Sequence, residues 1–143
     1  MPYRYIENIA TADAAFEAWG STEEKMMKAA VDAFMNVMVE NVDAVDSKER
    51  RLVHVESDSR DMLLFHLLEE LIYLKDTEGL LLRISSTQIQ HSNDHFTLDA
   101  ETYGEEINPE KHVLNVDVKA VTLYRYNIEQ NARGCTATVV LDI

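Results

Sequence analysis

The spacing of apolar residues changes once along the chain, near residue 80. Before it, apolar residues recur every three or four positions in two stretches, as they do in amphipathic helices. The first stretch runs from about Thr22 to Glu40, and Ser21 and Glu24 have the spacing of a capping box at its start. The second runs from about Ser59 to Glu78, carries a stripe of leucines and is closed by Gly79. We therefore predict two helices.

After residue 80 apolar and polar residues alternate, and this period of two is typical of strands. Between Phe96 and Glu101 every second residue is apolar, so one face of the sheet is expected to be wet while the other packs on the helices. The predicted strands are Tyr3–Asn8, Ala14–Trp19, Leu52–Glu56, Leu80–Gln90, His95–Tyr103, Val116–Glu129 and Cys135–Ile143. The pattern predicts one α+β domain over residues 1–143, with two layers: two main helices packed on a mixed, largely antiparallel β-sheet.

Charge excludes several classes of partner. Thirteen Lys and Arg residues against 26 Asp and Glu residues leave a formal net charge of −13. A chain with this charge is repelled by polyphosphates and by anionic membrane surfaces, so we expect no direct nucleic-acid binding. No apolar run approaches the roughly 20 residues that a membrane helix needs. The first residues lack the order of a secretion signal and Cys135 is the only cysteine, so we expect a cytoplasmic protein.

Two carboxylates and the end of the sequence are candidate metal ligands. Asp13 lies between two predicted strands, and the sequence ends in Leu141-Asp142-Ile143. If the last strand pairs with the strand beside Asp13, the side chains of Asp13 and Asp142 and the terminal oxygens of Ile143 converge. Such hard oxygen groups suit Ca²⁺, Mg²⁺ or Mn²⁺. The structural alternative is that Asp13 caps a turn and Asp142 is solvated.

The long connection from Gly104 to Asn115 and the segment after it form a second candidate region. Connections of this length tend to be functional or mobile. Asp117 and Lys119 follow it, two residues apart on a predicted strand and therefore on one face. Either they form a surface ion pair, or Lys119, one of few cations in an acidic chain, belongs to a surface that faces a partner.

Two other groups favour structural roles. His91 and His95 have the separation of a helical zinc pair, but Ser92-Asn93-Asp94 predicts a hairpin turn, which does not place both imidazoles on one face. Cys135 begins a β-branched strand without a neighbouring base, so we predict a buried, unreactive thiol.

Several motifs, taken in their order along the chain, resemble those of the archease family. They are Thr11-Ala12-Asp13, Glu70-Leu71-Ile72-Tyr73-Leu74-Lys75-Asp76-Thr77-Glu78-Gly79, Gly104-Glu105, Pro109-Glu110-Lys111-His112, Val118-Lys119-Ala120-Val121-Thr122 and Leu141-Asp142-Ile143. The resemblance runs nearly from end to end of the sequence, and the order and spacing of the motifs make it specific.

The resemblance implies an accessory role without turnover of its own. Archeases assist the GTP-dependent, RtcB-type RNA ligase that joins tRNA halves after intron removal, and they promote its guanylylation and multiple turnover. Asp13, Asp142 and Ile143 match the family's metal site, which is usually assigned to calcium. Lys119 matches a family lysine that would act on the active site of the ligase. An acidic protein fits this role, because a positively charged ligase surface would attract it.

Two alternatives and two departures from the family pattern stay open. The alternatives are an autonomous metal-dependent hydrolase built on the same carboxylates, and a chaperone or adaptor that binds exposed protein segments. Many relatives have His-Thr-Ala-Asp where this chain has Ala10-Thr11-Ala12-Asp13, and Thr-Tyr-His where it has Thr122-Leu123-Tyr124. The missing histidines at Ala10 and Tyr124 leave Asp13 and Lys119 intact.

Overall fold

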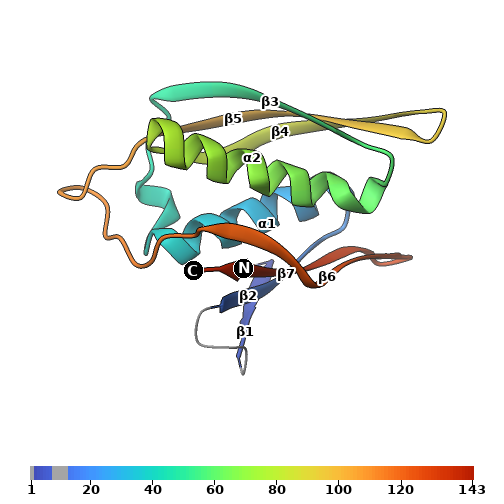
Figure 1. The fold of residues 1–143 in the computed structure, drawn as a ribbon, viewed down its shortest axis with the longest axis horizontal. Coiled ribbons are helices and arrows are strands. Elements are labelled where there is room, and N and C mark those ends of the chain that lie inside the picture. The colour runs from blue at the N-terminus through green and yellow to red at the C-terminus, as the bar shows by residue number, and fades with distance from the viewer. Residues whose placement is uncertain (1, 8–12) are drawn as a thin grey trace.

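The computed structural model describes residues 2–7 and 13–143 (Figure 1). Within these residues, two α-helices are accompanied by two short 3₁₀ turns and seven strands. The helical elements are α1 (Glu23–Met38), η1 (Val42–Ala44), η2 (Arg60–Met62) and α2 (Leu63–Glu78). The strands are β1 (Tyr3–Ile6), β2 (Asp13–Gly20), β3 (Glu49–Ser57), β4 (Leu80–Ser92), β5 (His95–Glu106), β6 (Ala120–Asn131) and β7 (Gly134–Asp142).

The strands form two separate sheets, of order β1-β2-β7-β6 and β3-β5-β4, and every neighbouring pair is antiparallel. The predicted α+β class is confirmed, but the one mixed sheet of the prediction is divided into two. Figure 1 shows the reason: α1 and α2 lie between the sheets, so the helical layer is covered on both sides. Helix α1 packs on β2 and β7 of one sheet and on β4 of the other.

Helix α1 is suited to this position because ten of its 16 residues are buried. Three of them, Ala29, Ala30 and Ala33, are small enough for a strand to approach the helix closely. The cap differs from the predicted capping box by one residue. The side chain of Thr22, rather than Ser21, accepts the backbone N–H of Lys25 at 3.2 Å and caps the helix.

Helix α2 carries the predicted apolar stripe. Leu64, Leu67, Leu68 and Leu71 are at most 2% exposed, and they fill the core between the helix and the sheet β3-β5-β4. Gly79 closes the helix with a left-handed backbone, at φ 68°, which glycine adopts without the steric cost that a side chain brings. Both the stripe and the stop signal are confirmed.

The β4–β5 hairpin also follows the prediction. Asn93 and Asp94 both have positive φ, 47° and 60°, as a tight two-residue hairpin turn requires. Along β5, Leu98 and Ala100 are buried, whereas the carboxylate residues between and after them face solvent. The predicted wet and packed faces are therefore confirmed for this strand.

Strand β6 begins later than predicted. The pattern placed its start at Val116, but the residues before Ala120 form no ladder, and the irregular connection covers residues 107–119. The side chain of Val118 is fully buried in the core, and its carbonyl accepts the Lys75 ammonium. Alternating polarity in this segment thus arises from one anchored apolar residue and not from strand pairing.

Glu105, at the end of β5, holds this connection in place. Its side chain is buried, and Oε2 accepts the Lys111 ammonium at 2.6 Å, the His112 Nε2–H at 3.2 Å and the backbone N–H of Asp46. His112 can donate from Nε2 because its Nδ1 accepts the backbone N–H of Asn108 at 3.0 Å. One carboxylate therefore ties together β5, the connection and the segment before β3.

Burial by itself raises the pKa of the Glu105 carboxyl, but its hydrogen bonds outweigh burial. Donation from the Asp46 backbone, Lys111 and His112 lowers the pKa from the ordinary value of 4.5 to about 2. Because the folded state binds the proton more weakly than the unfolded state does, this contribution to stability is fully present above pH 4.5. It is lost as the pH falls from there toward 2.

We therefore expect Glu105→Gln to be less stable than wild type at pH 6 and to lose less stability than wild type between pH 6 and pH 3. Denaturant unfolding at both pH values measures this difference. Glu106→Gln is the matched control, because Glu106 is exposed and forms no ion pair within residues 2–7 and 13–143. An equal acid dependence in Glu105→Gln and wild type would contradict the anchoring role.

Candidate functional site

The register of the first sheet brings together the two predicted carboxylates. Asp13 at the start of β2 and Asp142 at the end of β7 are direct cross-strand partners, and Asp142 also lies opposite Ala120 of β6. Side chains of directly opposed residues project from the same face, with Cβ atoms about 4.5–5.5 Å apart. The final strand, β7, thus lies beside β2. This is the pairing that the predicted convergence of Asp13 and Asp142 requires.

Ile143 follows Asp142 directly, and its half-buried side chain packs against the core. This packing keeps its main-chain oxygens at the same end of the sheet. Within residues 2–7 and 13–143, however, no group of three or more His, Cys, Asp or Glu side chains is gathered closely enough to hold a metal. A cation here would bind two side-chain carboxylates and main-chain oxygen.

Lys119 lies at the same sheet end. Its backbone N–H donates to the Asp142 carbonyl at 2.8 Å, immediately before β6 begins. Its side chain is exposed and forms no salt bridge with any residue that the structure describes. The predicted alternative of an ion pair with Asp117 is wrong, because the Asp117 carboxylate binds Lys75 instead. The Lys119 side chain therefore faces solvent, while its backbone is held next to Asp142.

Lys75 is the residue of this region that the sequence reasoning missed. Its side chain, on the last turn of α2, is only 3% exposed. It donates to Asp117 Oδ1 at 2.6 Å and to the Val118 carbonyl at 2.7 Å, and it pairs with Asp76 Oδ1 at 2.6 Å. Three acceptors thus match the three N–H donors of an ammonium. The contacts fix the segment that leads directly into Lys119.

Burial lowers the pKa of Lys75, but the Asp117 and Asp76 carboxylates outweigh it and raise the pKa above its ordinary value. Lys75 is therefore a charged group held by its partners. A sequence signal for it exists: Lys75 lies four residues after Leu71 and seven after Leu68, so it falls on the apolar stripe of α2. A charged residue on a buried stripe requires partners, and tertiary structure decides which ones.

The other sequence candidates have structural roles. His91 stacks on Phe96, with ring centroids 4.2 Å apart, while His95 bonds to Glu56 at 2.7 Å, so the two imidazoles have separate partners. Cys135 is buried and free, and burial raises the pKa of its thiol, as expected of an unreactive cysteine. The family position at Ala10 lies outside the described residues.

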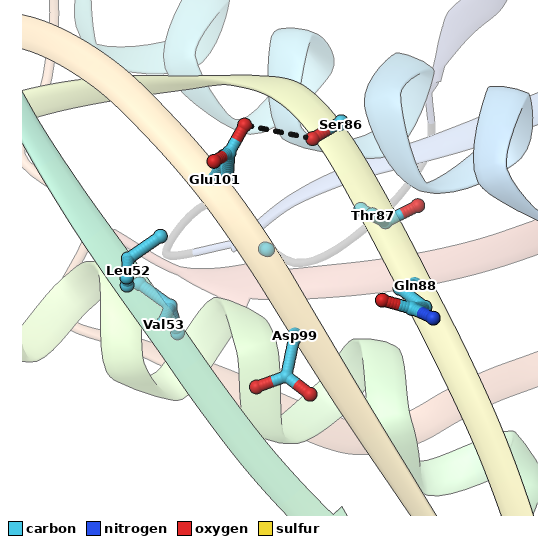
Figure 2. Close-up of a pocket in the computed structure, with 8 residues that line it drawn as sticks. Leu52, Val53, Ser86, Thr87, Gln88, Asp99 and Glu101 are labelled. Carbon is cyan, nitrogen blue, oxygen red and sulfur yellow. Dashed lines mark hydrogen bonds between the residues drawn. The ribbon is translucent and has the colours of Figure 1, made fainter.

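A shallow hollow on the outer face of β3, β5 and β4 is a separate feature (Figure 2). Glu101 accepts the Ser86 hydroxyl at 3.1 Å across it, and Asp99 lies further along β5. Its lining residues are Leu52, Val53, Ser86, Thr87, Gln88, Asp99, Ala100 and Glu101. They include no cation, imidazole or thiol, and they lie on the sheet that does not contain Asp13 and Asp142.

Comparisons with known proteins agree with this architecture. The profile of the Archease protein family matches residues 3–143. The archease of Pyrococcus abyssi is 38% identical over 124 residues, which cover 87% of each chain. The archease of Methanosarcina mazei is 32% identical over 142 residues, which cover 99% of this chain and 95% of that relative.

Two solved structures share the fold. The solution structure of protein 1598 of Methanobacterium thermoautotrophicum superposes with a TM-score of 0.84, at 32% identity and 99% coverage of both chains. The crystal structure of a Thermotoga maritima protein described as an archease and possible chaperone has a TM-score of 0.58, at 17% identity and 98% coverage of both chains. At that identity the second likeness concerns the fold alone.

The fold and the site define a class of small, acidic α+β proteins, in which paired carboxylates and an exposed lysine meet at the end of an antiparallel sheet. The chain belongs to the archease family. Neither helix in the described part of the chain has the length and apolar character needed to cross a membrane.

We expect Lys75→Met to lower the free energy of unfolding by about 1–3 kcal/mol, because it leaves the buried Val118 carbonyl without a donor. Denaturant unfolding measures the loss. Asp76→Asn is the matched control, since Asp76 is exposed and its loss leaves Lys75 with its other two acceptors. That control should change stability by less than about 1 kcal/mol. Equal losses in the two variants would contradict the anchoring role of Lys75.

Proposed function

We propose that this protein is an accessory protein of a GTP-dependent, RtcB-type RNA ligase in tRNA splicing, and that it promotes guanylylation and multiple turnover of the ligase. Membership of the archease family supports the proposal. The structural observation that carries it is an exposed Lys119, held at one sheet end beside Asp13 and Asp142. We propose a cytoplasmic protein that acts on the ligase and binds no RNA directly.

The proposed role of Lys119 follows from its surroundings. The residue is fixed from both sides, by the Lys75 contacts to Asp117 and Val118 and by its own N–H bond to Asp142, while its side chain stays exposed. A positioned ammonium can compensate the negative charge that develops on phosphoryl oxygens during nucleotidyl transfer. In this proposal Lys119 reaches the nucleotide pocket of the ligase, and a ligase histidine is guanylylated.

The proposed metal site consists of Asp13, Asp142 and Ile143. Carboxylate side chains and main-chain oxygen form an all-oxygen donor set, which suits a hard cation such as Ca²⁺, with Mg²⁺ or Mn²⁺ as alternatives, better than Zn²⁺. A cation here would relieve the repulsion between the cross-strand carboxylates of Asp13 and Asp142. It would also stabilise the sheet end that carries Lys119.

A multiple-turnover RNA ligation assay tests the function as a whole. Purified protein added to limiting ligase should raise the number of ligation events per ligase molecule. It should have no hydrolytic activity alone and should not protect unrelated unfolded proteins. Hydrolysis without ligase would favour the metal-dependent hydrolase, and protection of unrelated proteins would favour the chaperone or adaptor.

We expect Lys119→Ala to keep the melting temperature of the wild type, because an exposed lysine contributes little to stability. Ligase guanylylation in its presence should fall toward the unassisted rate. Lys28→Ala removes one charge from an exposed site on α1 and is the matched control. Lys119→Arg tests geometry, because a planar guanidinium need not fit where an ammonium does. Undiminished stimulation by Lys119→Ala would remove this residue from the mechanism.

We expect calorimetric titration with Ca²⁺ to give a binding isotherm for the wild type and none for Asp13→Asn. Ca²⁺ should also stabilise the wild type alone, by about 2.7 kcal/mol at a hundred times the dissociation constant. Glu17→Gln, a loss of charge on the same strand, should bind like the wild type. If the wild type binds neither Ca²⁺, Mg²⁺ nor Mn²⁺ at millimolar concentrations, the metal assignment is wrong.

A further inference from the structure

Strand β6 contains a large bulge in the middle of its ladder with β7. Thr122 pairs with Val140 and Asn127 pairs with Thr138, so the four residues 123–126 lie opposite Val139 alone. Within the bulge Arg125 has a left-handed backbone, with φ 56°, although it is not a glycine. Because β6 is an edge strand of its sheet, the bulge points away from the β7 ladder.

The bulge is anchored at one residue and exposed at two others. The Tyr126 hydroxyl accepts the Phe65 N–H at 3.1 Å and donates to the Asp61 carbonyl at 2.5 Å, which ties β6 to the start of α2. Leu123 and Tyr124 face solvent instead, at 64% and 58% exposure. The Arg125 guanidinium lies 5.4 Å from the Tyr124 ring centroid, within the range of a cation–π contact, and so restrains that ring.

Helix α2 packs beside β6. Figure 1 shows β6 running along α2, which contacts β6 through Phe65 at one end and the segment before β6 through Lys75 at the other. Glu69 and Tyr73 follow Phe65 at intervals of four residues along α2. Tyr73 is 59% exposed, and Glu69 is exposed as well.

Exposed acidic residues lie at both ends of this segment and on α2. Asp61 lies at the Tyr126 end, Asp76 and Asp117 lie at the Lys75 end, and Glu69 lies between them along α2. A cluster of exposed aromatic and aliphatic residues inside a charged rim has the composition of a protein interface. Because these rim residues are negatively charged, in a chain of net charge −13, a complementary partner would have basic residues around an apolar contact.

We infer that Leu123 and Tyr124 form a docking surface for the ligase, distinct from the sheet end that carries Lys119. This inference rests on the proposed function. An enzyme that holds tRNA halves must present basic residues to RNA phosphates, and the acidic rim complements such a surface. The docking surface supplies affinity, whereas Lys119 supplies activation.

The test uses the full chain and the purified ligase. The double variant Leu123→Ser, Tyr124→Ser should bind the ligase at least tenfold more weakly in calorimetry, while its melting temperature stays that of the wild type. Leu52→Ser is the matched control, because Leu52 is 80% exposed on β3 of the other sheet, and it should bind like the wild type. Raising the salt concentration should weaken wild-type binding, because the rim acts through charge.

Measuring ligase guanylylation with an excess of each variant distinguishes a loss of docking from a loss of activation. An excess of the double variant should restore full stimulation, since it retains Lys119, whereas an excess of Lys119→Ala should not. Undiminished affinity of the double variant, or an equal loss in Leu52→Ser, overturns the docking surface while the proposed function stands. If the wild type neither binds nor stimulates the ligase, the proposed function fails and the docking surface fails with it.

Discussion

The arrangement of the candidate site depends on one buried charge, the ammonium of Lys75. It joins the last turn of α2 to Asp117 and Val118, and through them to the start of β6. Helix α2, strand β6 and the irregular segment between β5 and β6 are therefore connected through the Lys75 ammonium. A buried ammonium is stable only with its acceptors in place, so the position of Lys119 is coupled to the packing of α2. The exposed Lys119 is therefore positioned by the buried Lys75.

Glu105 complements Lys75 from the opposite end of the irregular connection. It is a buried anion that binds Lys111 and His112, whereas Lys75 is a buried cation that binds Asp117. The long connection between β5 and β6 is thus pinned close to both ends by charge-assisted hydrogen bonds, which are stronger than neutral ones. Its length, which suggested mobility, is compatible with an ordered path because polar anchors replace regular secondary structure.

Two places on the first sheet separate the proposed tasks. One end gathers Asp13, Asp142 and Lys119, where charge dominates. The bulge of β6 presents Leu123 and Tyr124, where apolar contact dominates. Because the bulge inserts residues without disturbing β7, one strand can carry a charged segment and an apolar one in close succession. This division suits a protein that must both dock on a partner and act on it.

Local periodicity in the sequence determined the two helices, the leucine stripe of α2, the β4–β5 hairpin and the α+β class, because these depend on neighbours within a few residues. It also placed Asp13 and Asp142 as candidates. Only the tertiary structure decided that the strands form two sheets around a helical layer, that Asp117 binds Lys75, and that β6 starts at Ala120 and bulges. Those outcomes depend on contacts between residues that lie outside any one local pattern, and no such pattern specifies which buried charge meets which partner.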